Sequence, residues 1–391
     1  MRKIIHINYQ PLTKSYYQNN YISKCVSNQV EVEYWDLSKL YFPQIEFNEV
    51  GDLEIQVKRI QTFKELKLQL ECNTSAKSFY VTNITYEFRV LQLFWILNFY
   101  NCKLIFFARG MYPMPSKAAT SKIFQLIFKL KLSQITLGIK NRAALFLKKF
   151  KIIKPYDVVF RAGSEGGLTI GYGSGVDLKN AIITEINYFD YDKYLFAFNE
   201  MAPPLIKEKY CVFMDQYLAF HPDVAICGLQ NVDAEIYYQD LNAYFEYIEK
   251  TYDVKVVIAA HPKAISYETN NPFDGRKIIF DKTCELVQHS LFVLTHHSTA
   301  ISFPILFKKP IVFLNSMELK IKMPDLWDLT VFLADLLKSD LINFDCKASY
   351  NSLKLIVDSN IYDMYKYKYL TSQMSEQRYS EDIFMETISI I

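Results

Sequence analysis

Histidine and hydroxyl side chains follow two apolar runs in the second half of the chain. His261 comes directly after the run VVIAA, and His296, His297, Ser298 and Thr299 come directly after the run LFVLT. Apolar runs of this length predict buried strands of a parallel sheet. Ligands of such sheets bind outside the carboxyl ends of the strands, near the point where the strand order reverses. We therefore expect these side chains to lie in one crevice.

The hydroxyl pair at Ser298 and Thr299 begins a predicted helix, TAISFPILF. Free backbone N–H groups and the helix dipole favour an anion at such a position, and a phosphate is the expected guest. The alternative is a hydrogen-bonded loop histidine at 261 and a simple N-cap serine or threonine. Adjacent histidines at a strand end point in different directions, so we expect no metal at His296 and His297.

Composition excludes several other classes of protein. The 391 residues are half apolar, which predicts a large core and two domains, and a net charge of +2 argues against nucleic-acid binding. The cysteines are odd in number and form no CxxC pair, so we expect neither a disulfide framework nor a zinc cluster but a reducing compartment. They are Cys25, Cys72, Cys102, Cys211, Cys227, Cys284 and Cys346.

Basic residues are concentrated in one interval. Between Glu87 and Asp157 there is no acidic residue, and basic amphipathic helices are predicted at 117–132 and 139–150. The segment 117–154 therefore predicts contact with an anionic membrane surface, the alternative being core-packed helices with a solvated lysine face. The chain begins without a signal-peptide pattern and has no apolar run of about 18 residues. These features predict a cytoplasmic protein that lies peripherally on the inner membrane.

Strand-like and helix-like runs alternate along the chain, which predicts βαβ units on parallel sheets. Strands are expected at 3–9, 77–83, 102–108, 156–163 and 180–187 in the first half and at 210–215, 254–260, 291–296 and 310–315 in the second. The pair Pro203 and Pro204 predicts a linker. We therefore expect an N-terminal Rossmann-like lobe at 1–200 and a C-terminal Rossmann-like lobe at 207–391 that ends in a helical tail.

The sequence AAHPK, followed by HHSTAISFPILFKKPIVFL, resembles the HP motif and the Ser/Thr-rich motif of bacterial glycosyltransferases that use CMP-activated sugars. These are the sialyltransferase and Kdo-transferase types, and the resemblance extends to surface-carbohydrate proteins of capsule and O-antigen clusters. It covers residues 210–315. The resemblance implies an α/β, GT-B-like fold in which two Rossmann-like lobes face a central cleft. It also implies that the N-terminal lobe binds the acceptor and the C-terminal lobe binds the nucleotide sugar. His261 and Pro262 would then shape the site for the nucleotide phosphate, and Ser298 and Thr299 would bind this phosphate from the helix start, with Lys263 and His297 beside them.

The chain departs from this family at the general base. The sialyltransferases carry an acidic pair before a glycine, whereas this chain has Glu165 in AGSEGG, with a serine in place of the other acid. Inverting sugar transfer needs a carboxylate or histidine near the acceptor hydroxyl. We rank Glu165 first, then Asp215 and Asp190, and the alternative for each is a turn carboxylate. The glycine-rich stretch 163–175 is read either as a loop over the acceptor or as a plain hairpin.

Together these observations predict a glycosyltransferase that moves a nonulosonic-type sugar (sialic, legionaminic or pseudaminic acid, or Kdo) from a CMP-sugar donor to a surface glycan or lipid-linked glycan. No metal cofactor is expected, because no DxD pair stands directly at the end of a predicted strand. Two alternatives stay open within enzymes: a GT-B transferase or epimerase that uses a UDP-sugar, and a polyol-phosphate transferase. A third is a non-catalytic assembly partner with the same fold.

Overall fold

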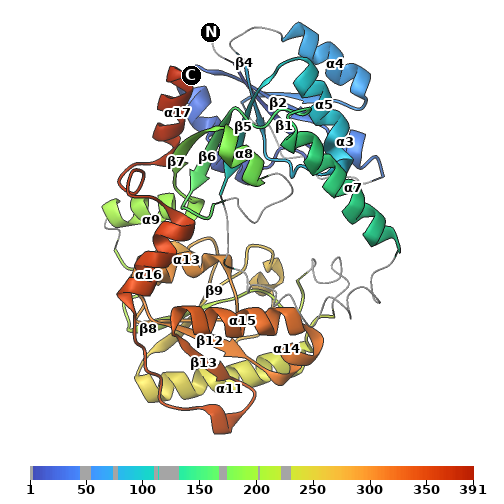
Figure 1. Ribbon diagram of the computed structural model, residues 1–391. Helices are drawn as coiled ribbons and strands as arrows, with labels where there is room; N and C mark the ends of the chain where they lie inside the picture. Colours follow the sequence, from blue (N-terminus) through green and yellow to red (C-terminus); the bar gives the residue numbers. More distant parts are fainter. Residues whose placement is uncertain are drawn as a thin grey trace. The chain divides into compact units, whose positions relative to one another are not determined.

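The computed structural model describes residues 3–44, 54–73, 78–109, 113, 132–166, 174–200, 203–221 and 230–391. The chain forms two compact units. The described residues of unit 1 fall within 1–111, 117–189 and 371–391, and those of unit 2 are Pro113 and residues within 190–370. Each unit is an α/β layer structure built on one sheet (Figure 1).

Unit 1 contains a seven-stranded parallel sheet of order β3-β2-β1-β4-β5-β6-β7. Its strands are β1 (Lys3–Asn8), β2 (Glu31–Asp36), β3 (Gln56–Arg59), β4 (Ser78–Thr82), β5 (Lys103–Ala108), β6 (Val158–Ala162) and β7 (Ile182–Ile186). Its helices are α1 (Lys14–Asn19), α2 (Ile22–Ser27), α3 (Ser38–Tyr41), α4 (Phe63–Cys72), η1 (Phe88–Val90), α5 (Leu91–Phe99), α7 (Leu132–Lys149), α8 (Ser174–Asn180) and α17 (Ser380–Ile390).

Alternate residues of β1 enter separate cores on the two faces of this sheet. Ile5 and Ile7 pack with the apolar side of α5, whereas Ile4 packs with α2 and α17. The C-terminal helix contributes Phe384, which is fully buried and contacts the rings of Phe107 and Phe160. The end of the chain thus completes the core of unit 1, where α17 lies beside β7 (Figure 1).

Unit 2 repeats the same plan with six parallel strands, in the order β10-β9-β8-β11-β12-β13. Its strands are β8 (Tyr210–Met214), β9 (Lys255–Ala259), β10 (Ile278–Ile279), β11 (Val293–Thr295), β12 (Ile311–Asn315) and β13 (Asp340–Asn343). Its helical segments are α9 (Phe189–Glu200), α11 (Ala234–Tyr252), η2 (Ile265–Glu268), α12 (Thr283–His289), η3 (Thr299–Ile301), α13 (Ser302–Leu306), α14 (Met317–Lys322), α15 (Pro324–Leu337), η4 (Lys347–Ser349), α16 (Ser359–Tyr365) and η5 (Lys366–Leu370).

The sequence of unit 2 favours these elements locally. The strands β8 and β12 are buried at every position, as expected for a parallel sheet covered by helices on both faces. The helix α11 begins after Asp233, whose carboxylate accepts hydrogen bonds from the N–H groups of Glu235 (3.0 Å) and Ile236 (3.2 Å). The strand order reverses between β8 and β11, which is the position at which doubly wound folds bind their ligands.

The predicted α/β class with two Rossmann-like units is confirmed. The boundaries differ from the expected 1–200 and 207–391, because the chain passes between units after Phe189 and returns to unit 1 at Thr371. The prolines Pro203 and Pro204 therefore lie inside unit 2, between α9 and β8. Of the two predicted basic helices, the second is α7, and residues 117–131 of the first lie outside the described part of the chain. None of the described helices is both long and apolar enough to cross a bilayer.

Candidate functional site

The candidate site is the carboxyl edge of β9, β8 and β11, three neighbouring strands at the point of strand reversal in unit 2. Their last residues are in register, since Met214 of β8 pairs with Ala259 of β9 and with Thr295 of β11. The segments that follow carry Asp215, His261 and His297. The structure therefore brings together residues that are up to 82 positions apart in the sequence, as the strand pattern predicts.

His261 is half-buried in the turn after β9, and its ring is held on two sides. Its Nδ1 accepts a hydrogen bond from the backbone N–H of Lys263 at 3.2 Å, so the neutral ring carries its proton on Nε2. The ring of His221 meets it edge to face, with centroids 4.9 Å apart. The side chains of Pro262 and Lys263 are exposed beside it. With Nδ1 accepting this bond, the Nε2–H group of His261 is a donor for an anion.

His221 was not among the predicted site residues, although a signal for it exists. It stands before Pro222, so the chain contains a second HP pair besides His261 and Pro262. His221 lies seven residues beyond the end of β8, whereas the predicted site residues follow their strands closely. The doubly wound topology puts the loops of β8 and β9 side by side, and this brings the two rings together.

Ser298 and Thr299 begin the helical segment after β11, as predicted, but the segment is short. A single 3-10 turn, η3, leads into the five-residue helix α13. The Ser298 hydroxyl accepts a hydrogen bond from the N–H of Ala300 at 3.1 Å, which is the N-cap role considered as the alternative. Its O–H remains a donor, and the Thr299 side chain is exposed. Both hydroxyl groups can therefore donate to an anion at this edge.

His297 and His296 have different environments. Burial lowers the pKa of His297 to about 3, and its Nδ1 is buried without a hydrogen-bond partner among the residues that the structure describes. The backbone N–H of His297 donates to Oε1 of Gln216 at 3.0 Å, which ties the β11 loop to the β8 loop. A neutral His297 thus follows β11 with one buried nitrogen that has no partner among the described residues.

The expectation that His296 also points into the crevice is wrong. This residue is buried in the core, where Nδ1 donates to the carbonyl of Leu314 at 2.8 Å and Nε2 accepts from the Tyr237 hydroxyl at 2.7 Å. Burial lowers its pKa to about 4. Side chains alternate along a strand, so two adjacent histidines at its end reach opposite sides. His296 is a structural residue with both nitrogens satisfied.

Asp215 follows β8 and is the most perturbed acid of the site. It is 6% exposed, and neither carboxylate oxygen has a well-formed hydrogen bond among the described residues. Burial raises its pKa to about 6, although nearby groups, the backbone N–H of Tyr217 first and the Tyr267 hydroxyl next, oppose the rise. A carboxylate held near neutrality is suited to proton transfer.

The other two candidate bases lie elsewhere. Asp190, in the first turn of α9, hydrogen-bonds the hydroxyl of Ser302 at the start of α13, and burial raises its pKa. That bond fastens α9 to α13, which is a structural role. Glu165 belongs to unit 1 and is half-buried in the turn after β6. In this turn Gly163 has φ +71°, and the N–H of Gly166 donates to the carbonyl of Gly163 at 3.2 Å.

The structure shows why one position of the glycine-rich stretch 163–175, Gly166, requires glycine. A Cβ there would lie 2.2 Å from the carbonyl oxygen of Ala162 and 2.6 Å from that of Ala108. The turn therefore packs directly against the ends of β5 and β6, which only glycine permits. The rest of the stretch, residues 167–173, lies outside the described part of the chain.

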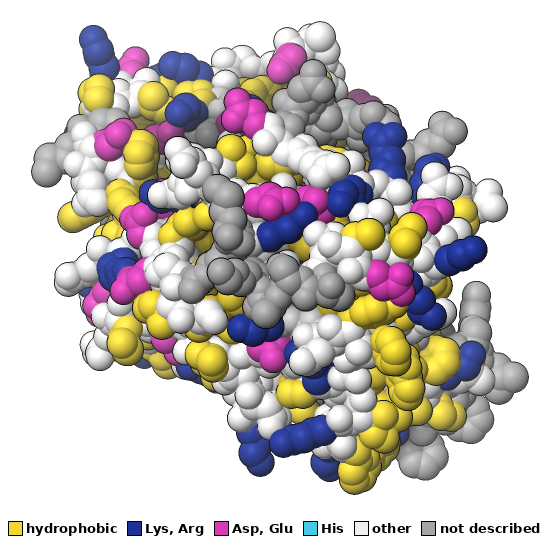
Figure 2. All heavy atoms as spheres, turned by 90° about the horizontal axis from the view of Figure 1, so that it is seen from above, with side chains coloured by type: hydrophobic (Ala, Val, Ile, Leu, Met, Phe, Trp, Pro, Cys, Tyr) yellow, Lys and Arg dark blue, Asp and Glu magenta, His cyan; other side chains and the backbone are white. Residues whose placement is uncertain are grey.

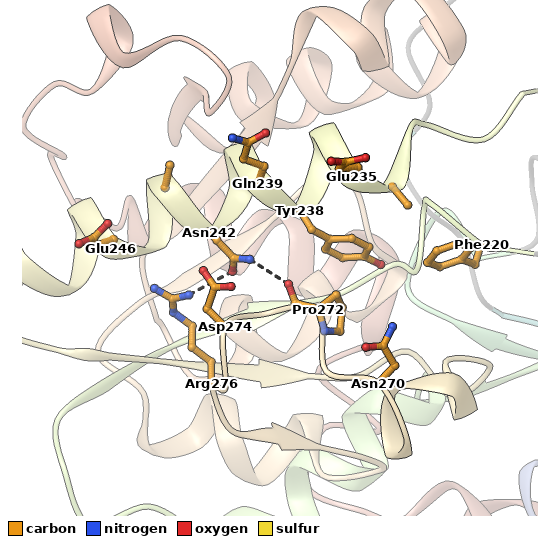
Figure 3. A pocket seen from close by; sticks show the side chains of 12 residues that line it. Phe220, Glu235, Tyr238, Gln239, Asn242, Glu246, Asn270, Pro272, Asp274 and Arg276 are labelled. Carbon is orange, nitrogen blue, oxygen red and sulfur yellow. Dashed lines mark hydrogen bonds between the residues drawn. The ribbon is translucent and has the colours of Figure 1, made fainter.

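A groove of about 880 Å³ lies next to the site, between α11 and the segment 270–276 (Figure 3). None of the predicted site residues lines it. Several of its polar groups bind one another: Nδ2 of Asn242 donates to the carbonyl of Pro272 at 2.8 Å, and Arg276 donates to Oδ1 of Asn242 at 3.1 Å. These bonds hold the segment 270–276 on the helix, so the groove is distinct from the strand-edge site.

Comparison with known proteins finds distant structural similarity alone. No family model and no curated protein matches the chain. Solved structures that are similar over 100% of this chain include a UDP-GlcNAc 2-epimerase from Methanocaldococcus jannaschii (9% identity, 100% of that chain, TM-score 0.46) and the wall teichoic acid polymerase TagF (12%, 89%, 0.49). The calicheamicin glycosyltransferase CalG4 is a third (9%, 98%, 0.49).

Proposed function

We propose that this protein is a glycosyltransferase that takes a nonulosonic-type sugar from a CMP-sugar and transfers it to a surface glycan. The observation that carries the proposal is the convergence of His261, Asp215 and the His297 to Thr299 segment on one strand edge at the reversal point of unit 2. Doubly wound sheets bind nucleotides at this edge. The donor groups there suit a phosphate, and the carboxylate suits proton transfer.

The loop after β8 favours one phosphate over a dinucleotide pyrophosphate. In dinucleotide-binding folds this loop is rich in glycine, so that the backbone can approach the pyrophosphate closely. Here the chain from Asp215 to Asp233 contains one glycine, Gly228, and no G-x-G-x-x-G pattern. The phosphate groups of the ligand are therefore assigned to the ends of β9 and β11, where His261 and Thr299 can donate to a single phosphate from two sides.

Asp215 is our first choice for the general base, ahead of Glu165. In the proposed reaction the acceptor hydroxyl attacks the anomeric carbon, the carbon–oxygen bond to the phosphate breaks, and its electron pair leaves on CMP. The hydroxyl proton passes to the base. Asp215 has a pKa near the working pH and shares the strand edge with His261. Asp190 is the weakest choice, because its carboxylate is bonded to Ser302.

A thermal-shift panel of CMP, CDP, UMP, UDP and GDP tests this proposal, because a ligand raises the melting temperature only when the native protein binds it. CMP is expected to give the largest rise. A larger rise with UDP would favour a UDP-sugar enzyme, and one with CDP a polyol-phosphate transferase. Activity that disappears with EDTA would contradict the metal-free reaction, and a protein that responds to no nucleotide would be an assembly partner.

A further inference from the structure

The helix α7 of unit 1 buries a lysine and exposes apolar side chains, which is the reverse of the usual arrangement on a surface helix. Lys148 is 0% exposed, and its ammonium binds the Asp177 carboxylate at 2.7 Å in a pocket that includes the rings of Tyr86 and Tyr156. On the same helix Phe146 is 54% exposed, and Phe150, just beyond its end, is 70% exposed. Burial of a lysine beside solvent-facing phenylalanines costs free energy in water. This orientation of α7 is explained if an apolar environment outside the protein covers its exposed apolar side.

The exposed apolar side chains of α7 form a stripe. Ile139, Ala143, Phe146 and Phe150 are all exposed and follow one another at intervals of three and four residues, which puts them on one side of a helix. Asn141, Ala144 and Lys148 form the buried side. The rings of Phe146 and Phe150 stack on each other, with centroids 6.2 Å apart.

The neighbouring helix α5 extends this stripe. Its Asn98 accepts from the N–H of Lys154 at 3.0 Å and donates to the carbonyl of Ile152 at 3.4 Å, so the end of α5 is fastened to the turn after α7. Both helices lie on the same side of unit 1 (Figure 1). We call the exposed apolar residues of these segments the α5–α7 face: Trp95, Phe99, Ile139, Phe146, Phe150 and Ile152.

Positive charge surrounds the α5–α7 face. Lys140, Arg142, Lys149 and Lys151 are exposed on α7 and the turn after it, and no acidic residue occurs in residues 88–156. The flanking acids are already occupied, since Glu87 pairs with Arg89 at 2.8 Å and Asp157 with Lys154 at 2.8 Å. In the view of Figure 2, hydrophobic side chains likewise gather next to Lys and Arg side chains at the lower right.

We propose that the α5–α7 face binds the surface of a bilayer that contains anionic lipid. Its tryptophan and phenylalanine side chains would enter the boundary of the acyl chains, and its lysines would meet the lipid phosphates. A second copy of the chain is a poorer occupant, because a two-fold interface would bring two basic faces together. This inference concerns unit 1 and is independent of the nucleotide site.

Flotation with vesicles tests the proposal. We expect the protein to float with phosphatidylcholine vesicles that contain phosphatidylglycerol and much less with pure phosphatidylcholine. The double variant Phe146→Ser/Phe150→Ser should weaken binding tenfold or more, by ~1.5–3 kcal/mol per buried ring. Lys149→Gln/Lys151→Gln should weaken it about fivefold per lysine, which corresponds to ~1 kcal/mol each. The control is Ile321→Ser in unit 2, whose side chain is 75% exposed and which should bind as the wild type does.

Both double variants replace exposed side chains, so their melting temperatures and nucleotide binding should match the wild type. Equal flotation of wild type and both double variants would overturn the proposal, as would equal binding to the two kinds of vesicle. A lipid-free dimer that Phe146→Ser/Phe150→Ser converts to a monomer would overturn it in favour of a second copy.

Discussion

The rings of His221 and His261 meet edge to face at the carboxyl edge of unit 2, with centroids 4.9 Å apart. His221 lies seven residues beyond the end of β8, and His261 lies two residues beyond the end of β9. The contact restrains the orientation of His261 in addition to its hydrogen bond with Lys263. His221 is therefore a positioning residue for the proposed phosphate donor.

His221→Ala should weaken CMP binding about threefold to tenfold, which is the energy of one aromatic edge contact. His221→Phe should retain the affinity within about twofold, because it preserves the contact. The melting temperature should stay unchanged in both variants. His289→Ala, a change on α12 away from this edge, is the control. Wild-type affinity in His221→Ala, measured by calorimetry, would remove His221 from the site.

Asp215→Asn should make the protein more stable and less active. The pKa of Asp215 is raised to about 6 from an unfolded value near 3.8, so its buried charge destabilises the fold above pH 6 and not below pH 3.8. The amide removes up to roughly 3 kcal/mol of that cost at pH 8. Loss of the base should lower turnover ~10²-fold with CMP affinity retained. Full turnover in Asp215→Asn together with loss in Glu165→Gln would transfer the role of base to Glu165.

Asp177 is a buried carboxylate with a structural role, and it is the control for Asp215. It pairs with the fully buried Lys148 at 2.7 Å and accepts from the N–H of Tyr156 at 3.1 Å. Asp177→Asn leaves an uncompensated buried charge and should destabilise the protein by about 3 kcal/mol or more. Opposite signs of the change in melting temperature for Asp177→Asn and Asp215→Asn are therefore expected at pH 8.

Gly166→Ala should destabilise unit 1 by roughly 3 kcal/mol or more, because its Cβ would overlap the carbonyl oxygens of Ala162 and Ala108. Gly138 on α7 is the control, since a Cβ there meets no atom within 4 Å. Gly138→Ala should be neutral or stabilising by ~0.5–1 kcal/mol. Urea unfolding of the two variants measures the difference, and equal midpoints would show that the close approach at Gly166 is not required.

His296 should make stability depend on pH. Its pKa is lowered to about 4 by burial, so its contribution is complete above the unfolded value near 6.5 and is lost as the pH falls from 6.5 towards 4. The total is roughly 3 kcal/mol. His296→Gln should be less stable than the wild type at pH 7.5 and should lose less melting temperature between pH 7.5 and pH 5. Parallel curves for the two proteins would show that His296 does not titrate in this way.

In both sheets, the strands that consist of apolar runs could be predicted from the sequence. The sheet edge that carries His261 and His297 could be predicted as well. The strand β2 is not among the predicted strands, because its alternating acidic and apolar residues are typical of a half-buried strand, whereas the structure buries all but the first of its residues. Its Glu33 forms ion pairs with Lys3 at 2.7 Å and Lys58 at 3.0 Å, from the strands on either side, and accepts a hydrogen bond from Trp35 at 2.8 Å. Such pairing depends on the strand order, which a local pattern does not contain.

The positions of His221 and of the C-terminal helix α17 could not be predicted for the same reason. His221 reaches the site because the loops of β8 and β9 are neighbours, and Phe384 reaches the core of unit 1 because the chain returns there after unit 2. The opposite positions of His296 and His297 follow from the direction of one strand end. Each of these facts depends on contacts between residues far apart in the sequence.

The most direct test of the central claim is calorimetric titration of CMP into the wild-type protein, His261→Ala and Thr299→Val. Both changes remove a donor to the phosphate and leave the Ser298 cap intact, so CMP affinity should fall about tenfold or more in each with the melting temperature unchanged. CMP affinity equal to that of the wild type in both variants would show that this strand edge does not bind the donor phosphate.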